Sequence, residues 1–359
     1  MSSSFGKLLK ITVFGESHGP AVGFTADGFP AGEEIDLDAL TRFTARRRGG
    51  SALTTARKET DEPEFLSGLY RGRTCGTPLT AILRNADHRS ADYEALADLP
   101  RPGHADYTAA LKWKGNADLR GGGHFSGRLT APLTLAGGIA IQMLERRGIR
   151  VVSHVSQIGD IRDLPLGPFP PAGLENTDLP VISPEVHEKM KTLVTSCRKD
   201  GDSVGGAIEC GIYGLPTGLG NAMFGGVESR LSEVLFGIPA VKGVEFGDGC
   251  MLSSLRGSAA NDAFRIKDGH VVTETNHAGG ILGGITTGAP VIFRVGFKPT
   301  PSIALPQETV SLSRNENASV TVTGRHDPCI VLRASPVVEA AAALVILDLY
   351  LEEVGYGAF

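Results

Sequence analysis

Apolar residues recurring with a period near two predict strands, and those recurring with a period near 3.6 predict helices. The strand-like segments of this sequence are 8–14, 80–85, 150–158, 206–215, 240–246, 291–297 and 319–323. The helix-like segments are 37–48, 129–147, 184–199, 227–236 and 335–351. No long repeat, low-complexity tract or flexible linker separates these segments. We therefore expect one interlocked domain spanning residues 1–359.

Capping residues mark several helix boundaries. Asp36 suits an N-cap, and Ser183-Pro184 and Ser335-Pro336 each combine an N-cap with proline at the first helical position. The last helix is apolar nearly all round, interrupted mainly by Glu339 and Asp348. Such a helix must be buried on most faces, as it would be between two sheets.

One segment, residues 101–148, concentrates the polar chemistry. Gly121–Gly123 can adopt positive φ and let the backbone approach a ligand closely, because no Cβ is in the way. A histidine, a phenylalanine, a serine and Arg128 follow, and the predicted helix begins at Leu129. A glycine turn that leads into a helix N-terminus is typical of an anion site. A tight loop before a core helix is an equally good alternative.

Composition narrows the class of protein. The charged fraction of 21%, the apolar fraction of 41% and the net charge of −5 are those of an ordinary globular protein, with no reason to expect nucleic acid or a membrane as partner. The five cysteines include no C-x-x-C pair, which indicates neither a disulfide framework nor a metal site. The first residues lack the apolar run of a signal peptide, and no charge-free apolar run reaches membrane-spanning length. We expect a cytoplasmic protein.

Three glycine-bounded turns carry groups that can exchange protons, namely His18, His104 and Asp327, each with arginine nearby in the chain. Histidine can protonate a leaving oxygen near neutral pH, and arginine binds carboxylate or phosphate through two donors at once. Two side chains of the arginine run 46–48 could point toward a pocket that binds an anion. Structural alternatives remain open, because a lone histidine is often structural and a basic helix end complements the helix dipole. The residues alone indicate an enzyme acting on a small anionic substrate.

Eight motifs, in order along the chain, resemble those of the chorismate synthase family. They are FGESHG at 14–19, RRRGG at 46–50, RPGHADYT at 101–108, GGGHFSGRLTA at 121–131, AVKGVEFGDG at 240–249, NHAGGILGGI at 276–285, KPTPSI at 298–303 and GRHDPC at 324–329. One such motif would be weak, but eight in the same order are specific. The sequence is therefore identified as a member of this family.

The resemblance implies the last step of the shikimate pathway, in which 5-enolpyruvylshikimate 3-phosphate loses phosphate from C3 and a hydrogen from C6 to give chorismate. This anti-1,4-elimination involves no net redox change, yet the family requires reduced FMN. By resemblance, His18 protonates the departing phosphate, His104 lies beside flavin N1, and Asp327 lies near flavin N5 and helps relay the C6 proton. The implied fold is α+β, a β-α-β sandwich with long helices packed between two antiparallel sheets, and the implied assembly is a homotetramer.

The resemblance also assigns binding positions. The FMN contacts are His124, Phe125, Ser126, Ala240, Gly283, Lys298, Pro299, Thr300, Pro301, Ser302 and Arg325. The substrate-binding positions are Arg47 and Arg48, with Arg57 and Arg101 as further candidates.

Two departures from the family pattern affect these assignments. Many members have Arg-Ser-Ser where this chain has His124-Phe125-Ser126, so the contact made by position 124 is open. Ala52 stands where many members carry arginine, which places more of the anion binding on Arg57. The chain also lacks the G-x-G-x-x-G fingerprint of a βαβ dinucleotide site. We expect FMN to be reduced by a separate reductase or reductant, with the chain's own NADPH-dependent reduction as the alternative.

Two other functions are compatible with parts of the pattern. A non-catalytic flavin- or anion-binding protein would need none of His18, His104 and Asp327, so their joint presence argues against it. An ordinary flavin oxidoreductase would need a partner for hydride transfer, and the redox-neutral reaction implied by the resemblance has none.

Overall fold

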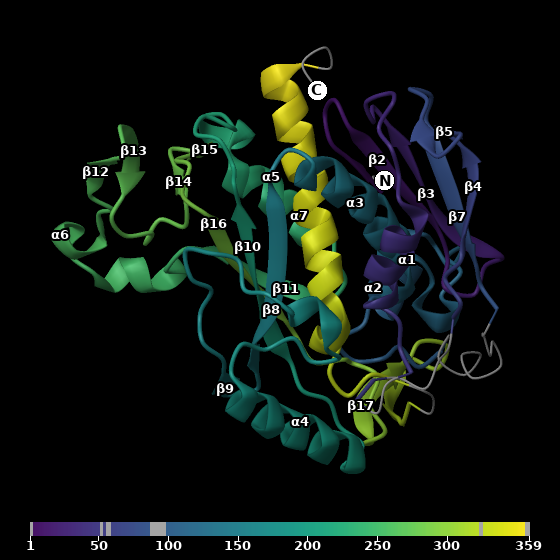
Figure 1. The fold of residues 1–359 in the computed structure, drawn as a ribbon. Helices are drawn as coiled ribbons and strands as arrows, with labels where there is room; N and C mark the ends of the chain where they lie inside the picture. Colours follow the sequence, from purple (N-terminus) through teal and green to yellow (C-terminus); the bar gives the residue numbers. More distant parts are fainter. Residues whose placement is uncertain (1–2, 51–52, 55–58, 87–97, 323–325, 356–359) are drawn as a thin grey trace.

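The computed structural model describes residues 3–50, 53–54, 59–86, 98–322 and 326–355 of the 359-residue chain. Over these residues the chain builds two five-stranded sheets, and every strand pairing in them is antiparallel. Long helices accompany the sheets, as Figure 1 shows. The fold is therefore α+β, which confirms that part of the expectation.

The strands of each sheet come from separate regions of the chain. The first sheet has the order β1 (Ser4–Phe5), β2 (Lys10–Gly15), β3 (Ala21–Asp27), β7 (Leu79–Arg84) and β4 (Pro63–Ser67). The second has the order β11 (Val241–Phe246), β16 (Val291–Phe297), β10 (Gly206–Tyr213), β8 (Arg150–Ile158) and β9 (Ile161–Arg162).

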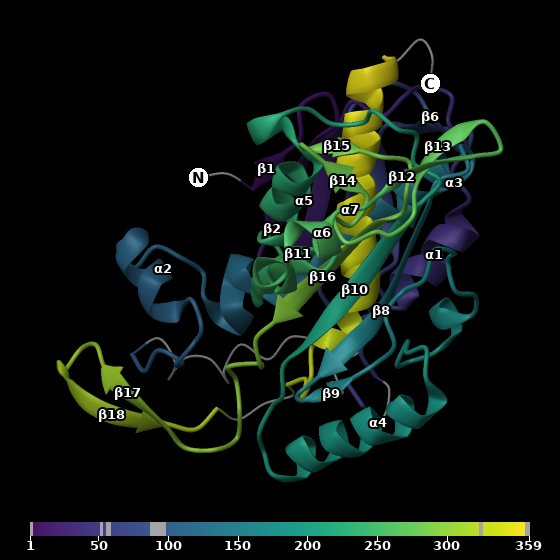
Figure 2. The ribbon, with the colours of Figure 1, turned by 90° about the vertical axis from the view of Figure 1, so that its left-hand side faces the viewer.

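Two-stranded ribbons and helices complete the described fold. The ribbons are β5 (Leu69–Tyr70) with β6 (Arg73–Thr74), β12 (Phe264–Lys267) with β13 (His270–Thr273), β14 (Ile281–Leu282) with β15 (Ile285–Thr286), and β17 (Gln307–Ser311) with β18 (Glu316–Val320). The helices are α1 (Leu37–Ala45), α2 (Asp106–Lys112), α3 (Thr130–Glu145), α4 (Pro184–Lys199), α5 (Val227–Leu235), α6 (Gly257–Ala260) and α7 (Val331–Val354). In Figure 2, α2 and the β17–β18 ribbon project from the same side of the molecule.

The centre of the molecule is made by α3 and α7, which pack against each other. Helix α3 contacts β3 and β7 of the first sheet, and α7 contacts β8 and β10 of the second. The two helices approach very closely at Gly137, where an added Cβ would lie 2.3 Å from the Cβ of Ala340. Only glycine permits that approach, so Gly137 sets the spacing of the two central helices.

Helix α7 is long and apolar enough to cross a membrane by length and composition alone, but 94% of its apolar window is buried inside the protein. Its two interior carboxylates satisfy polar groups of other elements. Asp348 accepts hydrogen bonds from the backbone N–H groups of residues 7, 8 and 9 and pairs with Arg230, while Glu339 accepts from Arg46 and Ser153. A buried charge needs such partners. The helix is a core helix anchored to both sheets.

The sequence-based boundaries were mostly correct and failed in identifiable places. Helix α7 begins at Val331, four residues before the expected N-cap, because burial of Val331 and Leu332 extends the helix and Pro336 lies inside it. The strand expected at 319–323 is instead β18, Glu316–Val320, whose ribbon partner β17 carried no clear alternating pattern. Thr323 lies outside the described residues. The glycine turn does not lead directly into α3, since two 3-10 turns (Arg120–Phe125 and Gly127–Leu129) intervene.

Candidate active site

A cavity of about 880 Å³ opens beside the N-terminal end of α7. Its lining comes from the end of α1, the triple-glycine turn, the loop before β11 and the loop after β16. Small-molecule sites commonly measure roughly 300–1,000 Å³. Segments from most of the chain length thus meet at one pocket of suitable size for a small ligand.

The three arginine side chains that follow α1 point in different directions. Arg46 turns into the core and pairs with Glu339 at 2.6 Å, whereas Arg47 and Arg48 line the cavity. The Nε atom of Arg48 is buried and has no hydrogen-bond partner within the part of the chain that the structure describes. A buried charged donor without an acceptor costs free energy unless a ligand supplies one. Of the three, Arg48 is the best placed to bind an anion.

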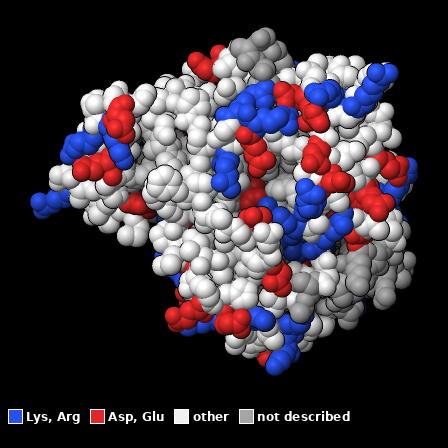
Figure 3. Space-filling view, in the orientation of Figure 1, with Lys and Arg blue, Asp and Glu red and all other residues white. Residues whose placement is uncertain are grey.

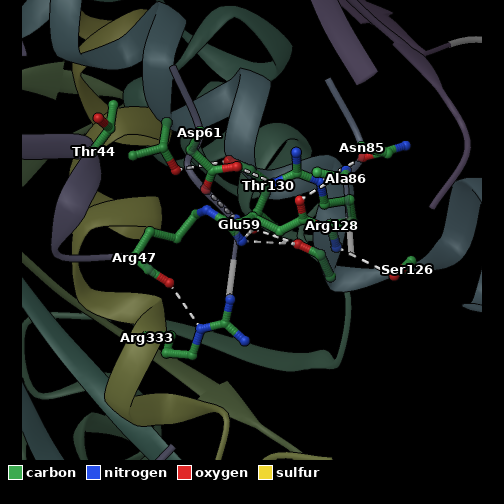
Figure 4. A network of polar contacts seen from close by, with 12 residues as sticks. Thr44, Arg47, Glu59, Asp61, Asn85, Ala86, Ser126, Arg128, Thr130 and Arg333 are labelled. Carbon is green, nitrogen blue, oxygen red and sulfur yellow. Dashed lines mark hydrogen bonds and ion pairs between the residues drawn. The ribbon is translucent and has the colours of Figure 1, made fainter. Parts of the chain in front are cut away.

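Arg47 and Arg128 share one buried carboxylate, that of Asp61 (Figure 4). Arg47 Nη2 lies 3.0 Å from Asp61 Oδ2, and Arg128 Nη1 donates to Oδ1. Burial alone would raise the pKa of Asp61, but the two guanidinium groups lower it to about 2, so the carboxylate is ionised. Burial, with Arg333 nearby, lowers the pKa of Arg47 to about 10, which still leaves it charged at neutral pH. Two cations and one anion leave this cluster net positive beside the cavity.

Arg333, in the first turn of α7, joins the arginine cluster to Asp327. Its Nη1 donates to Asp327 Oδ2 at 2.7 Å, and its Nε donates to the backbone carbonyl of Arg47 at 2.8 Å (Figure 4 shows the second contact). Asp327 and Arg333 both line the cavity. The predicted proton-relay carboxylate and a predicted substrate-binding arginine are therefore connected through one guanidinium group.

His18 lies against the triple-glycine turn. Gly121, Gly122 and Gly123 have φ values of 60°, 88° and 54°, in the left-handed region that favours glycine. A Cβ on Gly121 would lie 2.5 Å from His18 Nε2, and the backbone N–H of Ser17 donates to the carbonyl of Gly123 at 3.1 Å. His18 is buried. The turn at 121–123 takes this shape because His18 occupies the space a side chain would need.

Arg101 and His104 meet at the carboxylate of Asp106, the first residue of α2. His104 Nδ1 lies 2.6 Å from Asp106 Oδ1, and Arg101 Nε lies 2.7 Å from Oδ2. Burial alone would raise the pKa of Asp106, but hydrogen bonds from Arg101 and His104 lower it well below its usual range. Arg101 Nη1 also donates to Ser302 at 3.2 Å, which ties this group to the loop after β16.

Most of the predicted FMN positions border the same cavity. Those among its lining residues are His124, Phe125, Ser126, Ala240, Lys298, Thr300, Pro301 and Ser302. Thr300 Oγ1 is buried and lacks a hydrogen-bond partner among the residues described. Lys298 Nζ donates to the carbonyl of Gly103. The loop after β16 and the motif at 101–108 are thus in direct contact.

Other predicted positions lie elsewhere. Pro299 borders a second, more open hollow of about 590 Å³, and Gly283 lies in the turn between β14 and β15, away from the cavity lining. Arg57 and Arg325 lie outside the described residues.

The structure gives His124 a defined pair of partners. Its Nδ1 donates to the carbonyl of Gly15 at 2.8 Å, so Nε2 is free of hydrogen in the neutral ring and accepts from Ser3 Oγ at 2.8 Å. Phe125 packs against Trp113, with ring centroids 5.3 Å apart. Through its hydrogen bond to Gly15, His124 therefore links the glycine turn to the end of β2, just before His18.

Sequence reasoning assigned no role to Asp61, Asp106 or Arg333, and noted Arg128 without placing it in the site. Asp106 lies within the motif RPGHADYT, which was the available signal for it. Asp61 carries no sequence signal, because its role depends on contacts with residues 14 and 67 positions away. No group of three or more His, Cys, Asp or Glu side chains suited to a metal ion occurs in the described ranges.

An α+β fold with a cavity bordered by several arginines, His104 and Asp327 is the class of architecture expected of an enzyme with an anionic substrate. Comparisons with known proteins agree. Residues 9–351 match the family model for chorismate synthase. The chorismate synthase of Thermococcus kodakarensis is 50% identical over 344 residues, covering 96% of each chain, and that of Lancefieldella parvula is 46% identical, covering 97% of this chain and 96% of the relative. A crystal structure of chorismate synthase superposes with a TM-score of 0.78 at 27% identity, covering 98% of this chain and 94% of that one.

The chain belongs to the chorismate synthase family. It is accordingly a carbon–oxygen lyase acting on a phosphate, and its reaction is the last step of the shikimate pathway.

Proposed function

We propose that this chain carries out the anti-1,4-elimination of phosphate from 5-enolpyruvylshikimate 3-phosphate at the cavity beside α7, in the presence of reduced FMN. The observation that supports this site is the cluster of buried Arg47 and Arg128 with half-buried Arg333 around the pocket that His104 and Asp327 also line. A substrate with two carboxylates and a phosphate needs local positive charge, since the protein as a whole carries a net charge of −5.

Arg48 binds a substrate anion, because its buried Nε has no partner within the described residues. Arg47 and Arg101 contribute positive charge from positions fixed by Asp61 and Asp106. Arg57 is a further candidate for binding the substrate anions. The arginine fork suits planar carboxylate and phosphate oxygens, which favours binding of substrate in one orientation.

The residues around the cavity fit a flavin. Thr300 offers a buried hydroxyl that has no partner among the residues described, and at Gly122 a Cβ would lie 3.1 Å from His104 Nε2, so glycine lets the turn pack closely against that ring at the cavity wall. The predicted FMN contacts are His124, Phe125, Ser126, Ala240, Gly283, Lys298, Pro299, Thr300, Pro301, Ser302 and Arg325. When bound, reduced FMN supplies electron density that assists departure of the phosphate.

The proton transfers belong to the chain's own side chains. His18, buried beside the glycine turn, protonates the departing phosphate. Asp327, held by Arg333 at 2.7 Å, helps relay the proton lost from C6. His104, which lines the same cavity, would contact the N1 side of a bound flavin.

We further propose that the chain is one domain over residues 1–359, arranged as the β-α-β sandwich of the family. One hydrophobic core cluster that reaches from Leu9 to Leu351 supports both statements. The chain works as a cytoplasmic homotetramer. Large apolar side chains exposed near the projecting β12–β13 ribbon in Figure 1 support contact with other copies, and they include Met251, Phe264, Ile266 and Val271. On the face in Figure 3 acidic and basic side chains are intermixed, which favours neither nucleic acid nor a membrane as partner.

The deciding experiment is an anaerobic assay with chemically reduced FMN that follows phosphate release and chorismate formation. Equal amounts of both products support the proposal. FMN or substrate binding without turnover would favour a non-catalytic binding protein. Turnover that consumes NADPH in proportion to product would favour an oxidoreductase. Omitting the chemical reductant and adding NADPH tests whether a separate reductase is needed, as we expect.

A further inference from the structure

Asp106 is a buried carboxylate that holds two side chains of the cavity at once. Its Oδ1 accepts from His104 Nδ1 at 2.6 Å and from Arg101 Nη2 at 2.8 Å. Its Oδ2 accepts from the Arg101 Nε at 2.7 Å and from the Arg101 backbone N–H at 3.1 Å. All four short contacts come from Arg101 and His104, so one carboxylate fixes both the turn and the side chains it presents.

The Asp106 carboxylate selects one tautomer of His104. An ionised carboxylate can only accept, so the ring nitrogen facing Asp106 must be Nδ1–H. The Arg101 guanidinium can only donate, and its Nη2 lies 3.1 Å from Nδ1 and 3.4 Å from Nε2. The guanidinium therefore offers no acceptor for a ring N–H, and the Asp106 carboxylate alone places the hydrogen on Nδ1. The neutral ring therefore has its hydrogen on Nδ1 and its lone pair on Nε2.

The Nε2 atom lies close to the glycine turn, 3.1 Å from the point where a Cβ on Gly122 would stand, and His104 lines the cavity. The unprotonated nitrogen therefore belongs to a ring that borders the ligand space.

We propose that Asp106 is a positioning residue for the reaction, which locks neutral His104 in the Nδ1–H tautomer and so keeps the lone pair on Nε2 of a ring that lines the cavity. The exchangeable position of His104 is then Nε2, and the ring accepts a proton from a bound ligand before it can return one. This role for the proton at Nε2 rests on the proposed function, whereas the tautomer itself does not.

The test is nitrogen-15 NMR of protein labelled at histidine, with His104→Gln used to identify the His104 signals. The two neutral tautomers and the doubly protonated ring have distinct pairs of nitrogen shifts. We expect the neutral ring of wild-type His104 to show protonated Nδ1 and unprotonated Nε2. Finding the hydrogen on Nε2 in the wild-type protein overturns the proposal without the need for any variant at position 106.

Asp106→Asn supplies the second arm. An asparagine can present its amide N–H to the ring, and Nδ1 must then accept, which moves the hydrogen to Nε2. We expect the His104 signals to change to that tautomer or to a mixture, and turnover with reduced FMN to fall at least about tenfold, as for a histidine held in the wrong tautomer. Unchanged His104 signals in this variant overturn the proposal.

Asp163→Asn is the matched control, because Asp163 forms the other buried aspartate–histidine contact, with His154 at 3.1 Å, away from the cavity lining. It should alter the His154 signals and leave those of His104 and the turnover of the folded protein unchanged. Loss of turnover in wild type and every variant would count against the proposed function, while the tautomer of His104 would still decide the role of Asp106.

Discussion

Asp61 and Arg128 form an ion pair in which the two side chains are 4% and 3% exposed, although 67 residues separate them in sequence. The backbone of Asp61 adopts a φ of 48°, in the left-handed region that side chains other than glycine rarely occupy. Such a conformation costs on the order of 1–3 kcal/mol and persists only where surrounding contacts stabilise it. The two arginine contacts provide that stabilisation and place the strain beside the cavity.

Replacing this carboxylate should destabilise the fold strongly. Asp61→Asn leaves Arg47 and Arg128 buried without a counter-charge, and breaking a buried pair typically costs about 3–5 kcal/mol. The free energy of unfolding, measured by urea titration, checks the loss. Glu64→Gln, in the exposed pair with Arg84, is the control and should change stability little. Equal stabilities of the two variants would show that the Asp61 cluster contributes no more than a surface pair.

A second buried cluster predicts a pH dependence of stability. His154 is fully buried, with Nδ1 3.1 Å from Asp163 and Nε2 3.1 Å from Glu209. Burial alone would lower the pKa of His154, but the two carboxylate contacts raise it above the model-compound value of 6.5. A raised folded-state pKa means that the stabilisation is fully present below pH 6.5 and is lost as pH rises through the folded pKa.

Urea unfolding at a series of pH values from 6 to 9 measures this effect. Stability of the wild type should fall as pH rises, and His154→Gln should remove that part of the slope. His187→Gln, at a more exposed histidine paired with Glu188, should keep the wild-type slope. A wild-type slope that survives in His154→Gln would assign the pH dependence to other groups.

Local signals explain which parts of the fold were predictable. Ser183-Pro184 and Asp36 mark helix starts through local capping chemistry, and α4 and α1 begin where those signals lie. Ser335-Pro336 carries the same signal but predicted the wrong helix start, because tertiary burial of Val331 extends α7 toward its N-terminus. Strand β3 was missed since Gly23 interrupts its apolar run. Glycine is needed there because a Cβ would lie 2.5 Å from the ring of Phe14 on the neighbouring strand.

The same division applies to the site. His104, Asp327 and Arg48, which motif resemblance assigned to the site, line one cavity, whereas His18 is not among its lining residues. The groups that hold them, Asp61 and Arg333, were not predictable, because each acts through contacts between segments that only the folded chain brings together.

The two histidines proposed for proton transfer can be tested singly. His18→Ala and His104→Ala should each lower turnover by more than tenfold, since positioned proton transfer contributes roughly 10²–10⁴-fold. Anaerobic turnover with reduced FMN gives the rate, and flavin binding should persist. His270→Ala, at an exposed histidine on β13, is the control and should behave as wild type. Near-normal turnover in a folded variant would remove that histidine from the proposed mechanism.

Charge recognition by Arg48 predicts an effect on KM. Arg48→Ala should raise KM for the substrate roughly tenfold to a hundredfold, the range expected for loss of a charged hydrogen bond. Arg48→Lys should restore this only in part, because lysine lacks the forked donor geometry. Steady-state kinetics provide the measurement, with Arg42→Ala on the exposed face of α1 as control. Normal substrate binding by Arg48→Ala would mean that the run 46–48 is only a basic helix end.

The last prediction separates two roles of Asp327. Its carboxylate lies 2.7 Å from Arg333, with side chains 11% and 23% exposed, so a structural ion pair here is worth more than a surface pair. If Asp327 relays the C6 proton, Asp327→Asn keeps its shape and loses its basic oxygen. The expected result is a folded protein with strongly reduced turnover and nearly unchanged KM.

A purely structural Asp327 would give the opposite pattern. The variant would then show a lower melting temperature, because Arg333 and the Arg47 carbonyl it holds would lose their anchor, while the folded fraction turned over normally. Melting temperature and anaerobic turnover measured on one preparation distinguish the two. Arg333→Lys adds a check, since lysine keeps the charge near Asp327 but cannot bridge to Arg47 as well. A large loss of turnover in Asp327→Asn at an unchanged melting temperature supports the relay, and an active but destabilised variant contradicts it.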